Sequence, residues 1–193
     1  MKNRKEELLE KISGLFAKKG YEKSSMRDIA AHLAMTKAGL YYYFENKQQM
    51  LVDIINYGMD QALSEMRQEL PQIRNTEEKV EWIIRRQIDF YSQHQSRTKV
   101  SIHERDALEA KHARIISKKE KEYVKIVKQV IKQIIDENRA NISPQVATFS
   151  LLGMLNWLVH WYDPRGKVPP DRLASNILSL FLAGIKNQCP AEP

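Results

Sequence analysis

The sequence predicts an all-α protein, in which a three-helix helix-turn-helix domain precedes a larger helical domain, with about nine helices in total. Apolar residues recur every three or four positions along most of the chain. No segment alternates apolar and polar residues for long enough to form a convincing strand. Start signals for two short helices lie close together within residues 24–47. We expect the two domains to cover residues 1–47 and 48–193.

The composition is that of a globular protein. The 193 residues are 42% hydrophobic and 28% charged. They contain no uncharged apolar run of about 18 residues, so we expect no membrane span. The N-terminus lacks the apolar core of a signal peptide, and the only cysteine, Cys189 in the C-terminal tail, cannot form an intrachain disulfide. These features favour a cytoplasmic location.

The net charge of +7 is spread unevenly. Residues 1–47 hold ten Lys and Arg against six Asp and Glu, so a quarter of the chain carries over half of the excess. Such a concentration is consistent with a region that faces phosphates. A solvated surface rich in lysine is the alternative.

The first predicted helix ends at Lys18-Lys19-Gly20, because basic residues followed by glycine are typical of a helix C-terminus. Its apolar face consists of Leu8, Leu9, Ile12, Leu15 and Phe16.

Two helix starts define the helix-turn-helix. Ser25 and Asp28 form a capping box at the start of the second helix. Thr36 is the N-cap of the third helix, which Leu40 and Phe44 anchor to the core. The residues of the third helix that then point outward are Lys37, Ala38, Tyr41 and Tyr42. One cation, one small residue and two phenols suit a helix that enters the major groove of DNA.

The rest of the chain reads as further helices. The fourth starts at Asn46, with Gln49 as its capping-box partner, and ends at Glu69 before a proline. A helix near residue 143 has Ser143 as its N-cap and Pro144 at its first position. The other predicted helices cover residues 75–93, 100–108, 111–137 and 170–186, the helix from Ser143 runs to residue 162, and the polar stretch 94–99 is a break.

No catalytic or metal-binding pattern is present. Glu109-x-x-His112 has the spacing of half a di-iron site, but the chain holds no second copy of it. It also holds no glycine-rich phosphate loop and no nucleophile elbow. We therefore expect no enzymatic activity, no metal and no cofactor.

Several spaced motifs resemble the tetracycline-repressor (TetR) family of bacterial transcription regulators. They are Lys19-Gly20-Tyr21, then Ser-Ser-Met-Arg-Asp-Ile-Ala from Ser24, then Leu40-Tyr41-x-Tyr43-Phe44-x-Asn46-Lys47. The resemblance implies a homodimer that binds double-stranded operator DNA and a small effector. The implied DNA contacts are Ser25, Arg27, Thr36, Lys37, Ala38, Gly39, Tyr41, Tyr42 and Lys47. Ala34 departs from the family, which has glycine there; a left-handed alanine would cost on the order of 1 kcal/mol.

The last two predicted helices are apolar almost all round, which favours burial on every side. In the TetR family such helices pack against their symmetry mates. The expected dimer contacts are Phe149, Leu152, Gly153, Ile177, Leu180, Phe181 and Gly184. Burial within a monomer is the alternative.

Residues 153–164 resemble a branch of the TetR family that responds to acyl-coenzyme A thioesters. Such a ligand needs an apolar slot and cations for its phosphates. The expected ligand contacts are Arg86, Phe90, Tyr91, Arg105, Asn156, Trp157, His160 and Trp161, with Arg97 as a further candidate cation. Aromatic packing at the helix end is an equally open reading of the tryptophans. A multidrug-responsive regulator and a helical scaffold without DNA affinity are the alternative functions.

Overall fold

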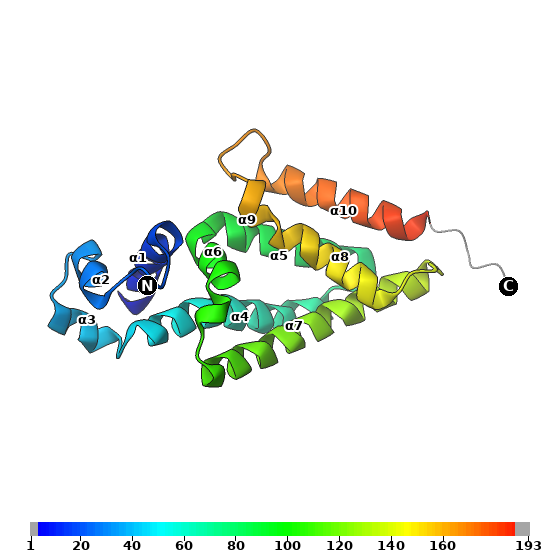
Figure 1. Ribbon diagram of the computed structural model, residues 1–193. Coiled ribbons are helices and arrows are strands. Elements are labelled where there is room, and N and C mark those ends of the chain that lie inside the picture. Colours follow the sequence, from blue (N-terminus) through cyan, green and yellow to red (C-terminus); the bar gives the residue numbers. More distant parts are fainter. Residues whose placement is uncertain (1–3, 188–193) are drawn as a thin grey trace. The chain divides into compact units, whose positions relative to one another are not determined.

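The structure is a computed structural model that describes residues 4–187. Within this range the chain forms ten α-helices and two short 3-10 helices, and no strand (Figure 1). The all-α prediction is confirmed. The chain divides into two compact units, Met1–Gln61 with His94–Lys119, and Ala62–Gln93 with Glu120–Pro193.

The first unit contains the predicted helix-turn-helix. Its helices are α1 (Arg4–Lys19), α2 (Met26–His32), α3 (Lys37–Tyr43), the first half of α4 (Lys47–Glu69), α6 (Gln95–His103), the 3-10 helix Arg105–Ala107 and the start of α7 (Ala110–Glu137). The apolar face predicted for the first helix is buried here, with Leu8, Ile12 and Phe16 each at most 1% exposed. Residues from α4, α6 and α7 complete the same core.

The second unit is built around an apolar core between α5, α7, α8 and α10. Its helices are the end of α4, the 3-10 helix Leu70–Gln72, α5 (Thr76–Gln93), most of α7, α8 (Pro144–Asn156), α9 (Leu158–Trp161) and α10 (Pro170–Lys186). Isoleucines of α7 and leucines of α8 meet in this core, because both helices carry apolar side chains at intervals of three and four.

Most predicted helix boundaries are confirmed. α5, α7 and α10 begin and end within one residue of their predicted limits. Asn46 caps α4 as expected, because its Oδ1 accepts the N–H of Gln49 at 2.7 Å. The capping box at α4 is wrong, however, since the Gln49 side chain donates forward to Asp53 at 2.7 Å.

Two further predictions about helices are wrong. The polar stretch 94–99 is not a break, because only His94 leaves the helical conformation and α6 already starts at Gln95. The helix from Ser143 does not run unbroken to Tyr162, because α8 ends at Asn156 and the four-residue α9 follows Trp157. Ser143 precedes α8 as predicted, but its side chain makes no capping hydrogen bond.

The compact units divide the chain differently from the predicted domains 1–47 and 48–193. Residues 48–61 and 94–119 join the first unit because Met50, Val100 and Ile116 are buried in the same core as α1–α3. The predicted division therefore stays a proposal about function. Cys189 lies outside the described residues, and none of the described helices is both long and apolar enough to cross a membrane.

Candidate functional site

The start of α2 is fixed by a reciprocal set of hydrogen bonds. The Asp28 N–H donates to Ser25 Oγ at 3.2 Å, and the Ser25 N–H donates to Asp28 Oδ2 at 2.8 Å. Lys19 Nζ lies 2.9 Å from the same carboxylate. Hydrogen bonds from the Ser25 hydroxyl and N–H, together with Lys19, hold the pKa of Asp28 well below its usual range. The predicted capping box is confirmed, and it uses the hydroxyl that was also expected to meet DNA.

The turn between α2 and α3 depends on a left-handed alanine. Ala34 has φ 52°, a conformation that favours glycine. The Ala34 N–H donates to Ala31 O at 3.1 Å and the Met35 N–H donates to Ala30 O at 2.9 Å. This pair of bonds is a Schellman motif with Ala34 in the position usually occupied by glycine. The helix-turn-helix therefore keeps the expected geometry in spite of Ala34.

The α3 surface consists of Thr36, Lys37, Ala38, Tyr41 and Tyr42, all exposed. Tyr41 is 52% and Tyr42 82% exposed, because Leu40 and Phe44 turn the opposite face of α3 into the core. Thr36 Oγ1 accepts the Gly39 N–H at 3.1 Å, which confirms Thr36 as the N-cap. A Cβ on Gly39 would lie 3.3 Å from that oxygen, so glycine makes room for the cap.

Two other predicted DNA contacts differ in their surroundings. Arg27 is exposed on α2. Lys47 is partly buried, because its Nζ donates to Tyr21 O at 3.0 Å and lies 4.0 Å from the centre of the Tyr21 ring. A phosphate contact by Lys47 stays a prediction.

The hydroxyl of Tyr21, whose ring lies against Lys47, stays neutral in the core. Burial, and then the carboxylates around it, raises the pKa of Tyr21 to about 12.

A buried ion-pair cluster fastens α6 to α1. Arg97 is 2% exposed; its Nε lies 2.8 Å from Glu10 Oε2 and its Nη2 donates to Glu6 O at 2.8 Å. His94 Nδ1 lies 3.0 Å from the same Glu10 carboxylate. The Arg97 guanidinium also lies 4.1 Å from the centre of the Tyr57 ring on α4. The prediction that Arg97 could bind a phosphate is therefore wrong, because two carboxylates already pair with its guanidinium.

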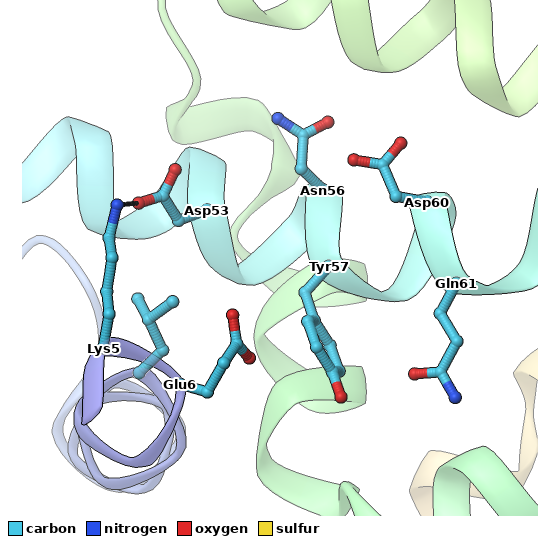
Figure 2. A pocket seen from close by; sticks show the side chains of 8 residues that line it. Lys5, Glu6, Asp53, Asn56, Tyr57, Asp60 and Gln61 are labelled. Atoms are coloured by element: carbon cyan, nitrogen blue, oxygen red, sulfur yellow. Dashed lines mark ion pairs between the residues drawn. The ribbon is translucent and has the colours of Figure 1, made fainter. Parts of the chain in front are cut away.

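An open depression of about 560 Å³ lies beside this cluster, between α1 and α4. Figure 2 shows the side chains of Asp53, Asn56 and Asp60 along α4, with Lys5 of α1 paired to Asp53 at 2.7 Å. Three carboxylates and one lysine line it, so its charge opposes a ligand with phosphates. Sequence reasoning did not identify this depression, because its residues come from helices some fifty positions apart.

The predicted effector residues are distributed over both units. Arg105 is partly buried on the 3-10 helix of the first unit. The second unit holds the other seven, and several already have partners there. Arg86 Nε donates to Glu65 at 3.0 Å, and the Tyr91 hydroxyl donates to Tyr162 O at 3.0 Å. A phosphate-binding role for Arg86 would require Glu65 to give way.

A polar chain crosses the second unit at the predicted ligand residue Asn156. Its Oδ1 accepts from Gln87 Nε2 at 2.9 Å, and Gln87 Oε1 accepts from the Tyr123 hydroxyl at 2.8 Å. Burial raises the pKa of Tyr123 far above its usual value, so this phenol is a fixed donor. The chain links α5, α7 and α8 through groups that a polar ligand could also use.

The aromatic residues near the end of α8 are exposed. Trp157 is 62% and Trp161 58% exposed, and Phe90 is only partly buried. The Trp157 and His160 rings stack with centroids 4.1 Å apart. The tryptophans therefore do not pack into the core of the second unit, which weighs against the reading of ordinary aromatic packing.

The predicted dimer contacts divide into two sets. Leu152, Ile177 and Phe181 are between 6% and 7% exposed and belong to the core of the second unit. The exposed members are Phe149, Gly153, Leu180 and Gly184, of which Phe149 is 54% and Leu180 70% exposed. The three buried residues pack inside the subunit, because one face of each helix covers the subunit's own core. Only the exposed members can contact a second subunit directly.

Comparison with protein families identifies the chain. Residues 5–54 match the family described as "Bacterial regulatory proteins, tetR family", and residues 74–185 match "Tetracyclin repressor-like, C-terminal domain". The chain belongs to the TetR family. The first match covers the helix-turn-helix described above, so the TetR resemblance of the sequence is confirmed.

Relatives and solved structures of TetR proteins extend over nearly the whole chain. The "HTH-type transcriptional repressor KstR2" of Mycobacterium tuberculosis is 22% identical over 190 residues, which are 96% of this chain and 94% of KstR2. A TetR-family regulator from Bordetella parapertussis has a TM-score of 0.88 and 29% identity, over 99% of this chain and 100% of that chain. The structure of "AibR in complex with isovaleryl coenzyme A and operator DNA" has a TM-score of 0.80 and 31% identity, over 92% of this chain and 97% of AibR.

Proposed function

We propose that this TetR-family protein is a repressor, which binds a palindromic operator as a homodimer and is released by an acyl-CoA thioester. The observation that supports this most is the likeness to AibR, which is 31% identical over 92% of this chain and was solved with isovaleryl-CoA and operator DNA. The α3 surface supplies the chemistry for DNA, with one cation and two phenols exposed on a capped helix.

The roles of the α3 surface follow from its chemistry. Lys37 and Tyr42 are proposed to reach base edges, and Tyr41 to contact a phosphate together with Lys47. Ser25 and Arg27 would hold the DNA backbone at the start of α2. Two such heads, held by a dimer about one helical turn (~34 Å) apart or a little more, would bind the two halves of a palindrome.

The dimer is proposed to form through the exposed residues of α8 and α10. Neither helix carries an Asp, Glu, Lys or Arg between Pro144 and Asn156 or between Leu173 and Ile185. Phe149 and Leu180 are exposed on these uncharged faces. A self-complementary apolar patch is what a twofold interface requires.

The effector is proposed to place its acyl chain near Trp157 and Trp161 and its phosphates near cations, with Arg105 as first choice. Arg97 is buried against two glutamates and Arg86 is paired with Glu65, so either would have to give up a carboxylate to meet a phosphate. The effector would favour a conformation in which the two heads no longer match the operator, by a difference in its affinity for the two states.

A gel-shift titration tests the proposal. The protein is bound to an operator obtained by selection from random duplexes, and isovaleryl-CoA is added beside the free acid, free coenzyme A and a set of lipophilic cations. Release by the thioester, at concentrations where the free acid and coenzyme A are inactive, is expected because each fragment makes only half of the contacts. Release by the cations alone would favour a multidrug-responsive regulator, and failure to select any operator would favour a scaffold protein.

A further inference from the structure

One face of α7 carries a continuous row of positive charge. Along the part of this helix that belongs to the second unit, exposed lysines follow one another at intervals of four, three and four. They are Lys121, Lys125, Lys128 and Lys132, which we name the α7 basic stripe. In an α-helix this spacing places all four within about 60° of each other around the axis.

The α7 basic stripe is almost free of neutralising partners. Among residues 4–187, only Lys132 of the stripe makes an ion pair, with Asp136. Glu122, which follows Lys121 on α7, is paired with Arg67. Exposed helical lysines and arginines are usually interleaved with acids, because like charges three and four residues apart repel one another and weaken the helix. This repulsion would be relieved by a polyanion laid along the stripe.

Paired cations elsewhere in the second unit make the contrast clear. Arg85 of α5 lies 2.7 Å from Glu81 and 2.9 Å from Asp171. Lys186 of α10 lies 2.7 Å from Glu77. Those cations fasten one helix to another or support their own helix. Apart from the Lys132–Asp136 pair within α7, the α7 basic stripe makes no ion pair in the part of the chain that the structure describes, so its charge is available to a partner.

The opposite face of α7 decides what kind of partner fits. Ile116, Val127, Ile131 and Ile134 are fully buried in the protein. A helix that lies on a membrane inserts its apolar face among the lipids, and α7 has already used that face. What remains is a line of charge from Lys121 to Lys132, about 17 Å long at 1.5 Å per residue. That length is about half a turn of duplex DNA, whose full turn is about 34 Å.

We propose that the α7 basic stripe is a second nucleic-acid contact, which binds the phosphate backbone of duplex DNA outside the operator. The stripe consists of lysines alone, which meet phosphates as compact charges, so the contact is expected to be independent of sequence. It would hold the protein on DNA while the α3 surface searches for an operator, or bring a second duplex to an operator-bound dimer. The choice of DNA as the polyanion rests on the proposed operator binding.

The test uses the full-length chain and two variants that lose the same charge. In the stripe variant, Lys121, Lys125, Lys128 and Lys132 are each changed to Gln. In the control variant, Arg74, Arg165, Lys167 and Arg172, which are exposed in the second unit, are each changed to Gln. Circular dichroism checks that both variants keep the helical content of the parent. Binding to a long duplex without an operator is then measured by fluorescence anisotropy over a series of salt concentrations.

The stripe variant is expected to flatten the plot of log affinity against log salt by about 0.9 for every lysine that contacts a phosphate, so by roughly two units or more. Its affinity for the long duplex at low salt should fall at least about tenfold, while the control variant follows the parent. If the stripe and control variants bind the long duplex alike, the proposal is wrong and the stripe is a solvated face.

Two further arms separate this proposal from others. A duplex no longer than the operator should bind parent and stripe variant alike, since the α3 surface alone is engaged. The two proposals can fail separately. If no operator can be selected but the stripe variant still loses affinity for the long duplex, the proposed repressor function is wrong and the stripe contact is supported. Vesicles of phosphatidylserine and phosphatidylcholine form the last arm. A stripe variant that loses vesicle binding but keeps DNA binding overturns the proposal in favour of a membrane surface.

Discussion

Two surfaces of the molecule expose large aromatic side chains, and they differ in the charge around them. On the α3 surface, Tyr41 and Tyr42 stand beside Lys37. The exposed residues on α8–α10 lie in segments 144–161 and 173–185, which contain no Asp, Glu, Lys or Arg; they include Phe149, Trp157, Trp161 and Leu180. Exposure alone indicates that a partner covers a surface. The charge beside it indicates which partner, because phosphates require cations and an apolar interface excludes them.

The two surfaces also depend on different parts of the fold. α3 has seven residues, and its orientation is set by the Ala34 turn, the Thr36 cap and two buried anchors. α8 and α10 pack on the large apolar core of the second unit, where many buried side chains together fix their positions. The α3 surface should therefore be sensitive to backbone geometry, and the α8–α10 surface to the chemistry of single exposed side chains.

The largest effect is expected from placing charge on the uncharged surface. Leu180→Asp removes about 2 kcal/mol of apolar burial from an interface. Because the interface is twofold symmetric, the substitution is present on both subunits and the loss is doubled. The dissociation constant of the dimer should therefore rise by about 10³-fold. Sedimentation should show a folded monomer with little operator affinity, since the two heads no longer bind together.

The matched control is Ile115→Asp, which changes an exposed residue of similar size on α7. It should leave the dimer intact. A Leu180→Asp protein that still sediments as a dimer would remove α10 from the interface.

The next effect is expected on the α3 surface. The double variant Lys37→Ala, Tyr42→Ala should weaken operator binding by at least about 10²-fold, because each base-edge contact contributes about 1–3 kcal/mol and the dimer uses two heads. Gel shifts with selected and scrambled duplexes measure the change, and specificity should fall more than non-specific binding. Lys11→Ala, on the exposed side of α1, is the control for charge. Unchanged operator binding by the double variant would contradict the assignment of α3 as the recognition helix.

A smaller effect is expected from the tryptophans of the uncharged surface. Trp157→Ala and Trp161→Ala should each raise the isovaleryl-CoA concentration for half-release by about tenfold, or ~1.4 kcal/mol. Operator affinity without effector should stay at the parental value. If operator affinity without effector falls as well, the tryptophan supports the dimer. If neither operator affinity nor the isovaleryl-CoA concentration for half-release changes, the tryptophan is not part of the effector site.

Local signals in the sequence predicted the α3 surface well. The capping box at Ser25, the cap at Thr36 and the left-handed position at Ala34 each depend on residues within five positions of one another. Such signals act before any tertiary contact is made. For the same reason the helix boundaries of α5, α7 and α10 were predicted to within a residue.

Contacts between distant segments could not be predicted in this way. The polar character of residues 94–99 predicts a break, because the partners that allow Arg97 to be buried cannot be seen locally. These partners are Glu6 and Glu10, which lie some ninety positions away in the sequence. The apolar pattern of α8 and α10 likewise does not reveal which face covers the subunit's own core. Leu152 and Phe181 are buried there, and Phe149 and Leu180 are not.

The smallest effect tests the turn that orients α3. Ala34→Gly should stabilise the protein by about 1 kcal/mol, because glycine adopts the left-handed conformation without the clash of a Cβ. For a chain of this size that corresponds to a rise in Tm of roughly 2–4 °C. Arg139→Gly is the matched variant, since Arg139 has φ 51° in the same motif after α7, where the Arg139 N–H donates to Asp136 O and the Ala140 N–H donates to Ile135 O. Both should raise Tm, and Ala31→Gly, inside α2, should lower it.

Operator affinity should be unchanged in Ala34→Gly, because the turn already has the geometry that glycine favours. A loss of affinity would show instead that the strain at Ala34 holds α3 in its DNA-binding orientation, and the α3 surface would then depend on its backbone even more than its two anchors indicate.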